Sequence, residues 1–90
     1  MLNFVLGGSI MPDITFNITE NVGTISENAR GWTKELNEVS WNDHAPKYDI
    51  REWSPDHTRM SKGLTFTAEE LGELRKLLNK LDLPTEDLPD

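Results

Sequence analysis

The sequence predicts an α+β fold in which four short strands precede one C-terminal amphipathic helix. Three observations predict it. Apolar and polar residues alternate in four stretches between residues 14 and 66, turn residues separate these stretches, and leucines then recur every three or four residues. Ninety residues make one domain with a thin core, which a second subunit would help to cover.

The first predicted strand begins at Ile14 and has an irregularity in its middle. Apolar residues alternate with polar ones as far as Ile18, and the pattern returns around Ile25. Either a tight turn near Gly23 separates two short strands, or a bulge bends one long strand. We favour the bend.

The second strand, predicted over residues 32–41, changes its face part of the way along. Its apolar side chains share one parity up to Leu36 and the other parity at Val39 and Trp41. A second irregularity is therefore expected near Asn37.

Two further strands are predicted over residues 47–53 and 60–66. Alternation in the third strand separates its apolar residues from a set on the opposite face, which comprises Lys47, Asp49, Arg51 and Trp53. In the fourth strand, Leu64 and Phe66 are expected in the core, and Gly63 is expected to allow a bend.

The helix has the clearest local signal in the chain. Thr67 and Glu70 match a capping box, in which the hydroxyl caps an amide and the glutamate reaches back. A leucine stripe follows, made of Leu71, Leu74, Leu77, Leu78 and Leu81. In the simplest interpretation the stripe packs on the sheet of its own chain, and in a sharper one it also meets the same stripe of a second subunit.

One helix covers only one face of a sheet, which leaves the other face free to bind something. That face is expected to hold Trp53, Arg51 and Lys47, with Trp41 beside them. Indole rings offer flat apolar surfaces on which unpaired bases stack, and cationic side chains neutralise phosphates. Tryptophans in small domains are mainly core residues, so composition alone also permits a packing role.

The net charge of −7 opposes binding to phosphates at first sight. The acidic excess, however, lies toward the two ends of the chain, because residues 28–66 contain six acidic and six basic residues. A basic face within this neutral middle is compatible with the sequence.

Several separated blocks resemble the family of the transcriptional coactivator positive cofactor four (p15). Asp49-Ile50-Arg51-Glu52-Trp53 is followed by a short acidic-proline turn and then by Lys62-Gly63-Leu64-Thr65-Phe66-Thr67, which runs into an acidic helix start. The blocks at residues 26–37, 39–42 and 46–51 resemble the bacterial YdbC-type branch of that family. The resemblance covers residues 14–81.

The resemblance implies a strongly bent antiparallel sheet and a homodimer joined through the helices. Paired strand ridges would grip single-stranded DNA, or RNA, with little sequence preference and without catalysis, in transcription, replication or repair. Carried over by position, the nucleic-acid-binding residues would be Trp41, Trp53, Arg51 and Lys62, with Lys34, Lys47 and Trp32 as weaker transfers. Asn42-Asp43 stands where the eukaryotic form has lysine, so tight binding and a coactivator role do not follow from the resemblance.

Two other classes of function are open to the same chain. A protein-interaction module would use the free sheet face to dock a transcription or replication protein, or a phage partner, without contacting nucleic acid. An enzyme or metal protein would need His44 or His57, each of which follows an aspartate. Two histidines without cysteine make a poor ligand set, so we expect no catalytic residue, no metal and no cofactor.

The remaining features concern location and the chain ends. The absence of cysteine fits a cytoplasmic, nucleoid-associated protein of a bacterium or phage, and no stretch approaches the roughly 20 apolar residues of a membrane helix. Residues 1–13 are expected to be a flexible leader and residues 82–90 an acidic tail, flanking a binding domain at residues 14–81.

Overall fold

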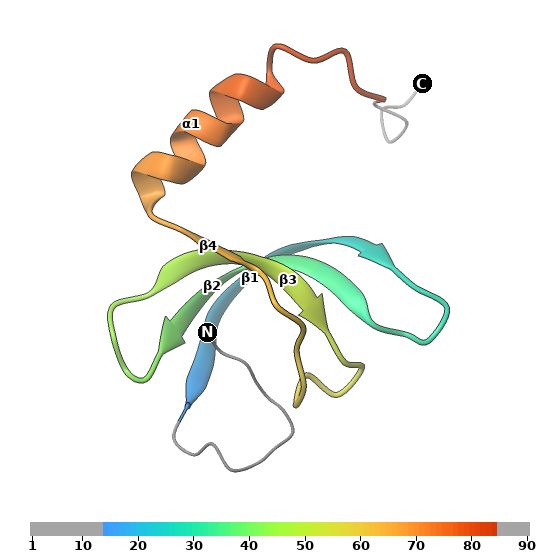
Figure 1. The fold of residues 1–90 in the computed structure, drawn as a ribbon, viewed down its shortest axis with the longest axis vertical. Helices are drawn as coiled ribbons and strands as arrows, with labels where there is room; N and C mark the ends of the chain where they lie inside the picture. Colours follow the sequence, from blue (N-terminus) through green and yellow to red (C-terminus); the bar gives the residue numbers. More distant parts are fainter. Residues whose placement is uncertain (1–13, 85–90) are drawn as a thin grey trace.

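The computed structural model describes residues 14–84, and Figure 1 shows their arrangement. The elements follow one another as β1 (Phe16–Glu27), β2 (Thr33–Trp41), β3 (Lys47–Trp53), β4 (Leu64–Phe66) and α1 (Ala68–Leu78). The four strands form one antiparallel sheet in the order β1-β2-β3-β4. The predicted ββββα order is confirmed, whereas the predicted leader and most of the predicted tail lie outside the described residues.

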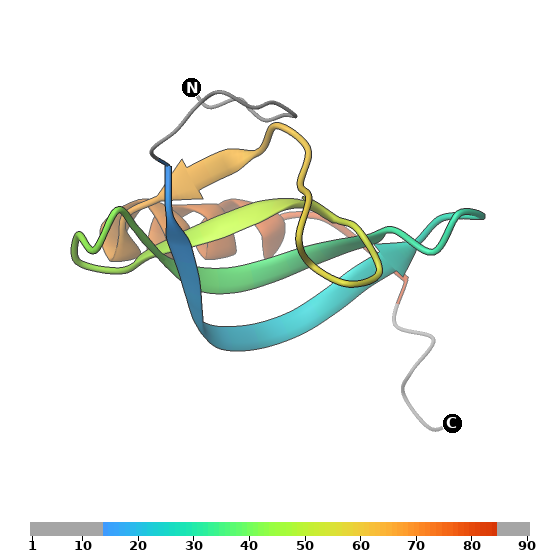
Figure 2. The same ribbon diagram turned by 90° about the horizontal axis from the view of Figure 1, so that it is seen from below.

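The predicted bend in the first strand is confirmed. β1 is one strand of 12 residues, and Figure 2 shows it turning sharply along its length. Its pairing with β2 shifts register at Ile18/Glu20, Asn21/Gly23 and Thr24/Ser26. Each shift inserts an unpaired residue, which bends the strand and increases its twist. The sheet therefore arches instead of lying flat.

The prediction of an irregularity in the second strand is wrong. β2 pairs with β3 without any shift, from Thr33 opposite Trp53 to Val39 opposite Lys47. The inner side of β2 is continuous but partly polar, because Glu35 and Asn37 are buried on it in line with Val39. These polar groups tolerate burial because they bond to each other: the Asn37 amide donates to the Glu35 carboxylate at 3.1 Å. The pattern of apolar residues alone therefore does not identify the side of β2 that faces the core.

The arched sheet has a concave and a convex side. Figure 1 shows α1 rising from the convex side, and Figure 2, viewed from below, shows the β3–β4 loop crossing in front of the sheet on the other side. Among residues 14–84, the two fully buried apolar side chains are Val39 and Trp53, and both belong to the concave side. Within residues 14–84, no helix has the length and apolar character needed to cross a membrane.

The fourth strand is shorter than predicted, and its first residue is not in the core. β4 contains three residues, while Met60 makes only an isolated bridge to Trp53. Leu64 is 65% exposed, because it lies on the convex side where the helix does not cover it. Just before it, Gly63 passes so close to β3 that a Cβ there would lie 2.4 Å from the Arg51 Cβ.

The helix begins as predicted. The Thr67 hydroxyl accepts from the Glu70 amide at 3.1 Å, and the Glu70 carboxylate accepts from the Thr67 amide at 2.9 Å, which completes the capping box. The helix ends at Leu78 with Asn79 as its C-cap, so Leu81 lies beyond it. No residue of α1 is buried within the chain, and most of its leucine stripe has little contact with the sheet.

Candidate nucleic-acid interface

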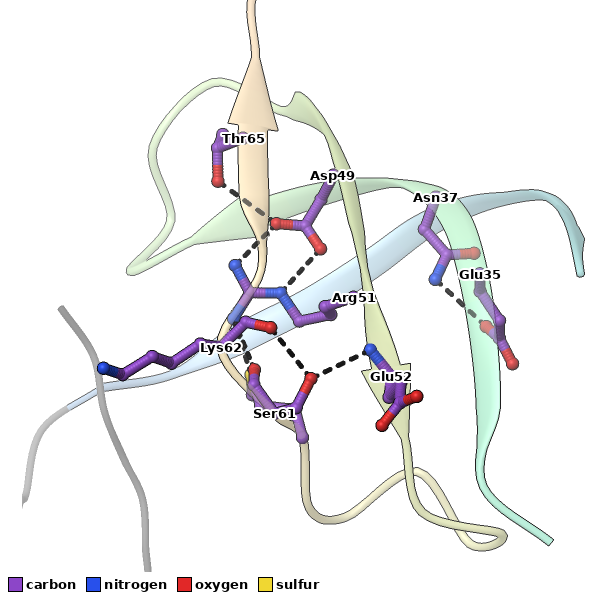
Figure 3. A network of polar contacts seen from close by, with 9 residues as sticks. Glu35, Asn37, Asp49, Arg51, Glu52, Ser61, Lys62 and Thr65 are labelled. Carbon is purple, nitrogen blue, oxygen red and sulfur yellow. Dashed lines mark hydrogen bonds and ion pairs between the residues drawn. The ribbon is translucent and has the colours of Figure 1, made fainter. Parts of the chain in front are cut away.

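A buried ion pair organises the concave side of β3. Arg51 Nε and Nη2 donate to the two Asp49 carboxylate oxygens, each at 2.7 Å, as Figure 3 shows. Thr65 of β4 donates a third bond to this carboxylate at 3.1 Å, and Arg51 Nη1 donates to the Ser61 carbonyl at 3.1 Å. Because every charged group here is paired, the guanidinium is fixed in one position.

Trp41 lies at the end of β2, between the ion pair and the start of β1. The Arg51 guanidinium carbon lies 4.7 Å from the centroid of its indole ring, a cation–π distance. The Phe16 ring lies 6.2 Å away at a tilt of 48°. Trp41 is only half-buried, so part of this rigidly held aromatic surface faces solvent.

Two predicted site residues are buried, which corrects the expectation that they lie on an open face, while their part in binding stays a prediction. Trp53 has no solvent-exposed surface, and Arg51 is 8% exposed. Alternation placed them correctly on one side of β3, but that side is the inside of the arch. Phe16 packs against Trp53 at 5.2 Å, and the His57 ring stacks on it at 5.7 Å with 15° between the planes. In this conformation the two residues support Trp41 and present no open face themselves.

The three predicted lysines are all exposed, but they do not share one side of the sheet. Lys47 begins β3 with the same parity as Arg51, and Lys62 lies on the edge beside Gly63 with its ammonium directed away from the ion pair (Figure 3). Lys34 alternates with the buried Glu35, so it lies on the convex side instead.

A second aromatic–cationic pair lies at the opposite end of the sheet. The Arg59 guanidinium carbon, from the β3–β4 loop, is 5.8 Å from the centroid of the Trp32 ring. Trp32 was a predicted site residue, whereas Arg59 was missed. Its position in a loop carries no periodic signal, so only the fold reveals that it meets the turn before β2.

The buried polar cluster behind Trp53 is centred on Glu35. Burial raises the pKa of Glu35, but hydrogen bonds from Thr33, Asn37 and His57 outweigh that effect and leave the pKa below its usual value. His57 Nε2 lies 2.8 Å from a carboxylate oxygen of Glu35. In the same loop, bonds from Thr58 and Ser54 lower the pKa of Asp56 to about 2.

The convex side presents an apolar surface. It is made of Leu64, Leu77, Leu78 and Leu81, which are 45–65% exposed and are called the leucine surface below. Leu71 and Leu74, also predicted for the dimer interface, are half-buried within the chain itself. Isolated exposed leucines are ordinary, whereas large contiguous apolar patches on a protein surface often belong to interaction sites.

These features define the class of protein: a small ββββα domain whose arched sheet holds aromatic and cationic side chains together on its concave side. Among the described residues, no group of three or more histidine, aspartate or glutamate side chains could hold a metal ion.

Comparison with known proteins gives the family. A family model described as Transcriptional Coactivator p15 (PC4) matches residues 28–77, more than half of the chain. A protein of Treponema pallidum (strain Nichols), described as an uncharacterized protein, is 47% identical over 77 residues, which cover 86% of this chain and 91% of that protein. The chain belongs to the transcriptional coactivator p15 (PC4) family, a non-enzymatic family that binds nucleic acid. Assignment to the YdbC-type branch stays a prediction.

Proposed function

We propose that the protein binds single-stranded DNA with little sequence preference, as a homodimer, in transcription, replication or repair. The proposal places it in the cytoplasm near the nucleoid. Family membership supports nucleic-acid binding in general. The preference for unpaired strands rests on the concave side of the sheet.

The observation that carries the proposal is the half-exposed indole of Trp41. Base–aromatic stacking contributes about 1–3 kcal/mol per base and tolerates any base, because every base has a flat face. Arg51 and Phe16 both contact the indole and hold it in place, so little side-chain entropy is lost when a base stacks on its exposed part. A duplex would not offer its base faces to such a ring.

Phosphates would be bound by Lys47, at the start of β3, and by Lys62, on the edge before β4, both of which are exposed. Two chains supply four such lysines. With a slope of about −0.7 per phosphate neutralised on a single strand, the affinity should fall about 50-fold for a fourfold rise in salt. The net charge of −7 limits this attraction, so we expect modest affinity at physiological salt.

Dimerisation is proposed through the leucine surface. A second copy would cover Leu77 and Leu78, which the chain leaves 55% and 45% exposed, and a two-fold axis would pair the same residues on both chains.

The test is a fluorescence titration with a poly-thymidine oligonucleotide and with a duplex, at two salt concentrations. We expect quenching by the single strand that salt reverses, and little effect from the duplex. Lys47→Ala/Lys62→Ala should weaken binding, whereas the matched double variant Arg75→Ala/Lys80→Ala, with the same change in net charge, should not. Equal losses from both pairs would show that general charge, and no defined face, governs binding.

A second candidate is a protein-interaction module, favoured by the acidic net charge and by two further exposed side chains on β1, Val22 and Ile25. Its partner would be a transcription or replication protein. In that case the oligonucleotide would leave the emission unchanged at low salt, and Trp41→Ala would leave capture of the partner intact.

A further inference from the structure

Asn42, the first residue after β2, lies in a tight turn that few residue types tolerate. Asn42 and Asp43 both have a positive φ, 49° and 64°. The His44 amide donates to the Trp41 carbonyl at 2.8 Å, which closes the turn. Two successive residues with positive φ are typical of a type I′ turn, in which glycine, asparagine and aspartate dominate. The backbone at position 42 therefore favours these three residue types.

The side chain of Asn42 also binds the residue just before β1. Its Oδ1 accepts from the Thr15 amide at 2.8 Å and from the Thr15 hydroxyl at 3.4 Å, while the Asn42 amide donates to the Thr15 carbonyl at 2.8 Å. In a regular antiparallel ladder the Thr15 amide would donate to the main-chain carbonyl of Asn42. The side-chain oxygen takes the place of that carbonyl, so the ladder continues by one pair into the turn. Glycine would suit the backbone but has no such oxygen.

This additional pair flanks the aromatic pair of the binding surface. Phe16 and Trp41 are the next partners in the ladder, and their rings lie 6.2 Å apart. Hydrogen-bonded and non-hydrogen-bonded pairs alternate along antiparallel strands. Because Thr15 and Asn42 exchange two bonds, Phe16 and Trp41 form a non-hydrogen-bonded pair, in which the side chains approach closely. The backbone of the aromatic pair is therefore held by the pairs on either side of it.

The start of β1 depends on this attachment because β1 is an edge strand. Within the described residues it pairs with β2 alone, and its first register shift already follows Ile18. Ile14 and Thr15 are exposed, so burial does not hold them. Strand ends with few buried contacts open most readily. Phe16 lies in this short segment, and the bonds to Asn42 secure the end of it.

We propose that Asn42 is a positioning residue of the single-strand site: its side chain holds the start of β1, which keeps Phe16 against the indole of Trp41. The inference rests on the proposed function, because that function depends on the same indole. Without the Asn42 oxygen, a smaller fraction of molecules would hold the indole in its fixed orientation. The apparent affinity for a single strand would fall with that fraction.

The first experiment needs no nucleic acid and compares the wild type with Asn42→Gly. Glycine tolerates the positive φ and keeps the main-chain amide, but it lacks the acceptor, and the net charge does not change. NMR should show faster hydrogen exchange of the Thr15 amide and weaker nuclear Overhauser effects between the Phe16 and Trp41 rings. Unchanged effects between the two rings would overturn the inference.

The second experiment measures affinity for a poly-thymidine oligonucleotide at low salt. Asn42→Gly should bind about two- to tenfold more weakly, the factor that corresponds to the net contribution of one hydrogen bond. The matched variant Asn42→Asp/Asp43→Asn restores an acceptor oxygen at position 42 without changing the net charge, and both residue types tolerate a positive φ. It should regain most of the affinity. A matched variant as weak as Asn42→Gly would overturn the inference.

A double-mutant cycle with Phe16→Leu separates positioning from general stabilisation. Leucine removes the ring but keeps an apolar side chain. If Asn42 acts through Phe16, Asn42→Gly should lower the affinity by a much smaller factor in the Phe16→Leu background than in the wild type. Equal factors in the two backgrounds would show that Asn42 does not act through the ring, and would overturn the inference.

Failure of the inference and failure of the proposed function give different results. If the wild type binds and Asn42→Gly binds equally well, the inference fails while the proposed function stands. If the wild type does not bind, the proposed function fails, and the inference fails with it.

Circular dichroism establishes that each variant is folded. Should Asn42→Gly prove unfolded, Thr15→Pro takes its place, because proline lacks the amide that donates to Asn42 and is tolerated at the edge of a sheet. The same weakening of the ring contact and of the affinity is expected from it, and their absence overturns the inference.

Discussion

The ion pair between Asp49 and Arg51 offers a direct test of how the concave side is stabilised. Both side chains are almost completely buried, 0% and 7% exposed, and they are joined by two bonds of 2.7 Å. Removing one partner leaves the other charge buried without a counter-charge, which costs about 3–5 kcal/mol. A domain of this size is stable by only about 4–11 kcal/mol, so Asp49→Leu or Arg51→Met alone should remove a large part of its stability.

The double variant Asp49→Leu/Arg51→Met should behave differently. Replacing a buried pair by apolar residues of similar volume is often neutral or stabilising, because neither charge is left unpaired. We expect the double variant to be at least about 2 kcal/mol more stable than either single variant.

The assay is urea unfolding followed by far-ultraviolet circular dichroism, at one fixed protomer concentration because dimer formation makes stability concentration-dependent. Additive losses in the double variant, or losses below about 1 kcal/mol in the single variants, would refute the argument that the charges are paired inside a desolvated arch.

Three further outcomes follow from particular residues. Gly63→Ala should destabilise the protein by more than about 1 kcal/mol in urea unfolding, because a Cβ would meet the Ile50 carbonyl oxygen and the Arg51 Cβ, each at 2.4 Å; a neutral result would contradict that close approach. The pKa of Glu35 is lowered from 4.5 in the folded protein, so the ionised carboxylate contributes its full stability above pH 4.5 and loses it as the pH falls through the lower folded pKa. The Glu35→Gln variant should therefore have a lower free energy of unfolding at pH 7, and that free energy should vary less with pH below 4.5. Parallel profiles of unfolding free energy against pH for the two proteins would contradict this. Leu78→Asp should give a monomer or an unfolded chain in light scattering, whereas a well-folded dimer would exclude the leucine surface as the interface.

Local signals in the sequence predicted the elements well where the chemistry is local. The capping box at Thr67 and Glu70 needs only residues three apart, and its two bonds form as expected. The bend in β1 was predicted from a broken alternation around Gly23, which is also a local pattern.

The inner face of the sheet could not be predicted in the same way. Alternation tells which side chains share a side, but the direction of the arch decides which side is enclosed, and that direction depends on three register shifts between β1 and β2. Trp53 and Arg51 were therefore assigned to the correct side, but the sequence did not show that this side closes over them.

Contacts between residues that are distant in the sequence could not be predicted either. Glu35 and Asn37 resemble solvent-facing residues of a strand. When they are buried, Asn21 and His57 from other segments add hydrogen bonds to those that form within β2. Arg59 reaches Trp32 for a similar reason, across two loops.

The central claim is that the indole of Trp41 stacks on unpaired bases while its support stays in place. Heteronuclear NMR of the indole N–H groups tests it directly, with Trp41→Phe to assign the signal. On addition of a thymidine oligonucleotide at low salt, the Trp41 cross-peak should move and should return when salt is added. A Trp41 signal that stays in place while the oligonucleotide is in excess would contradict the account.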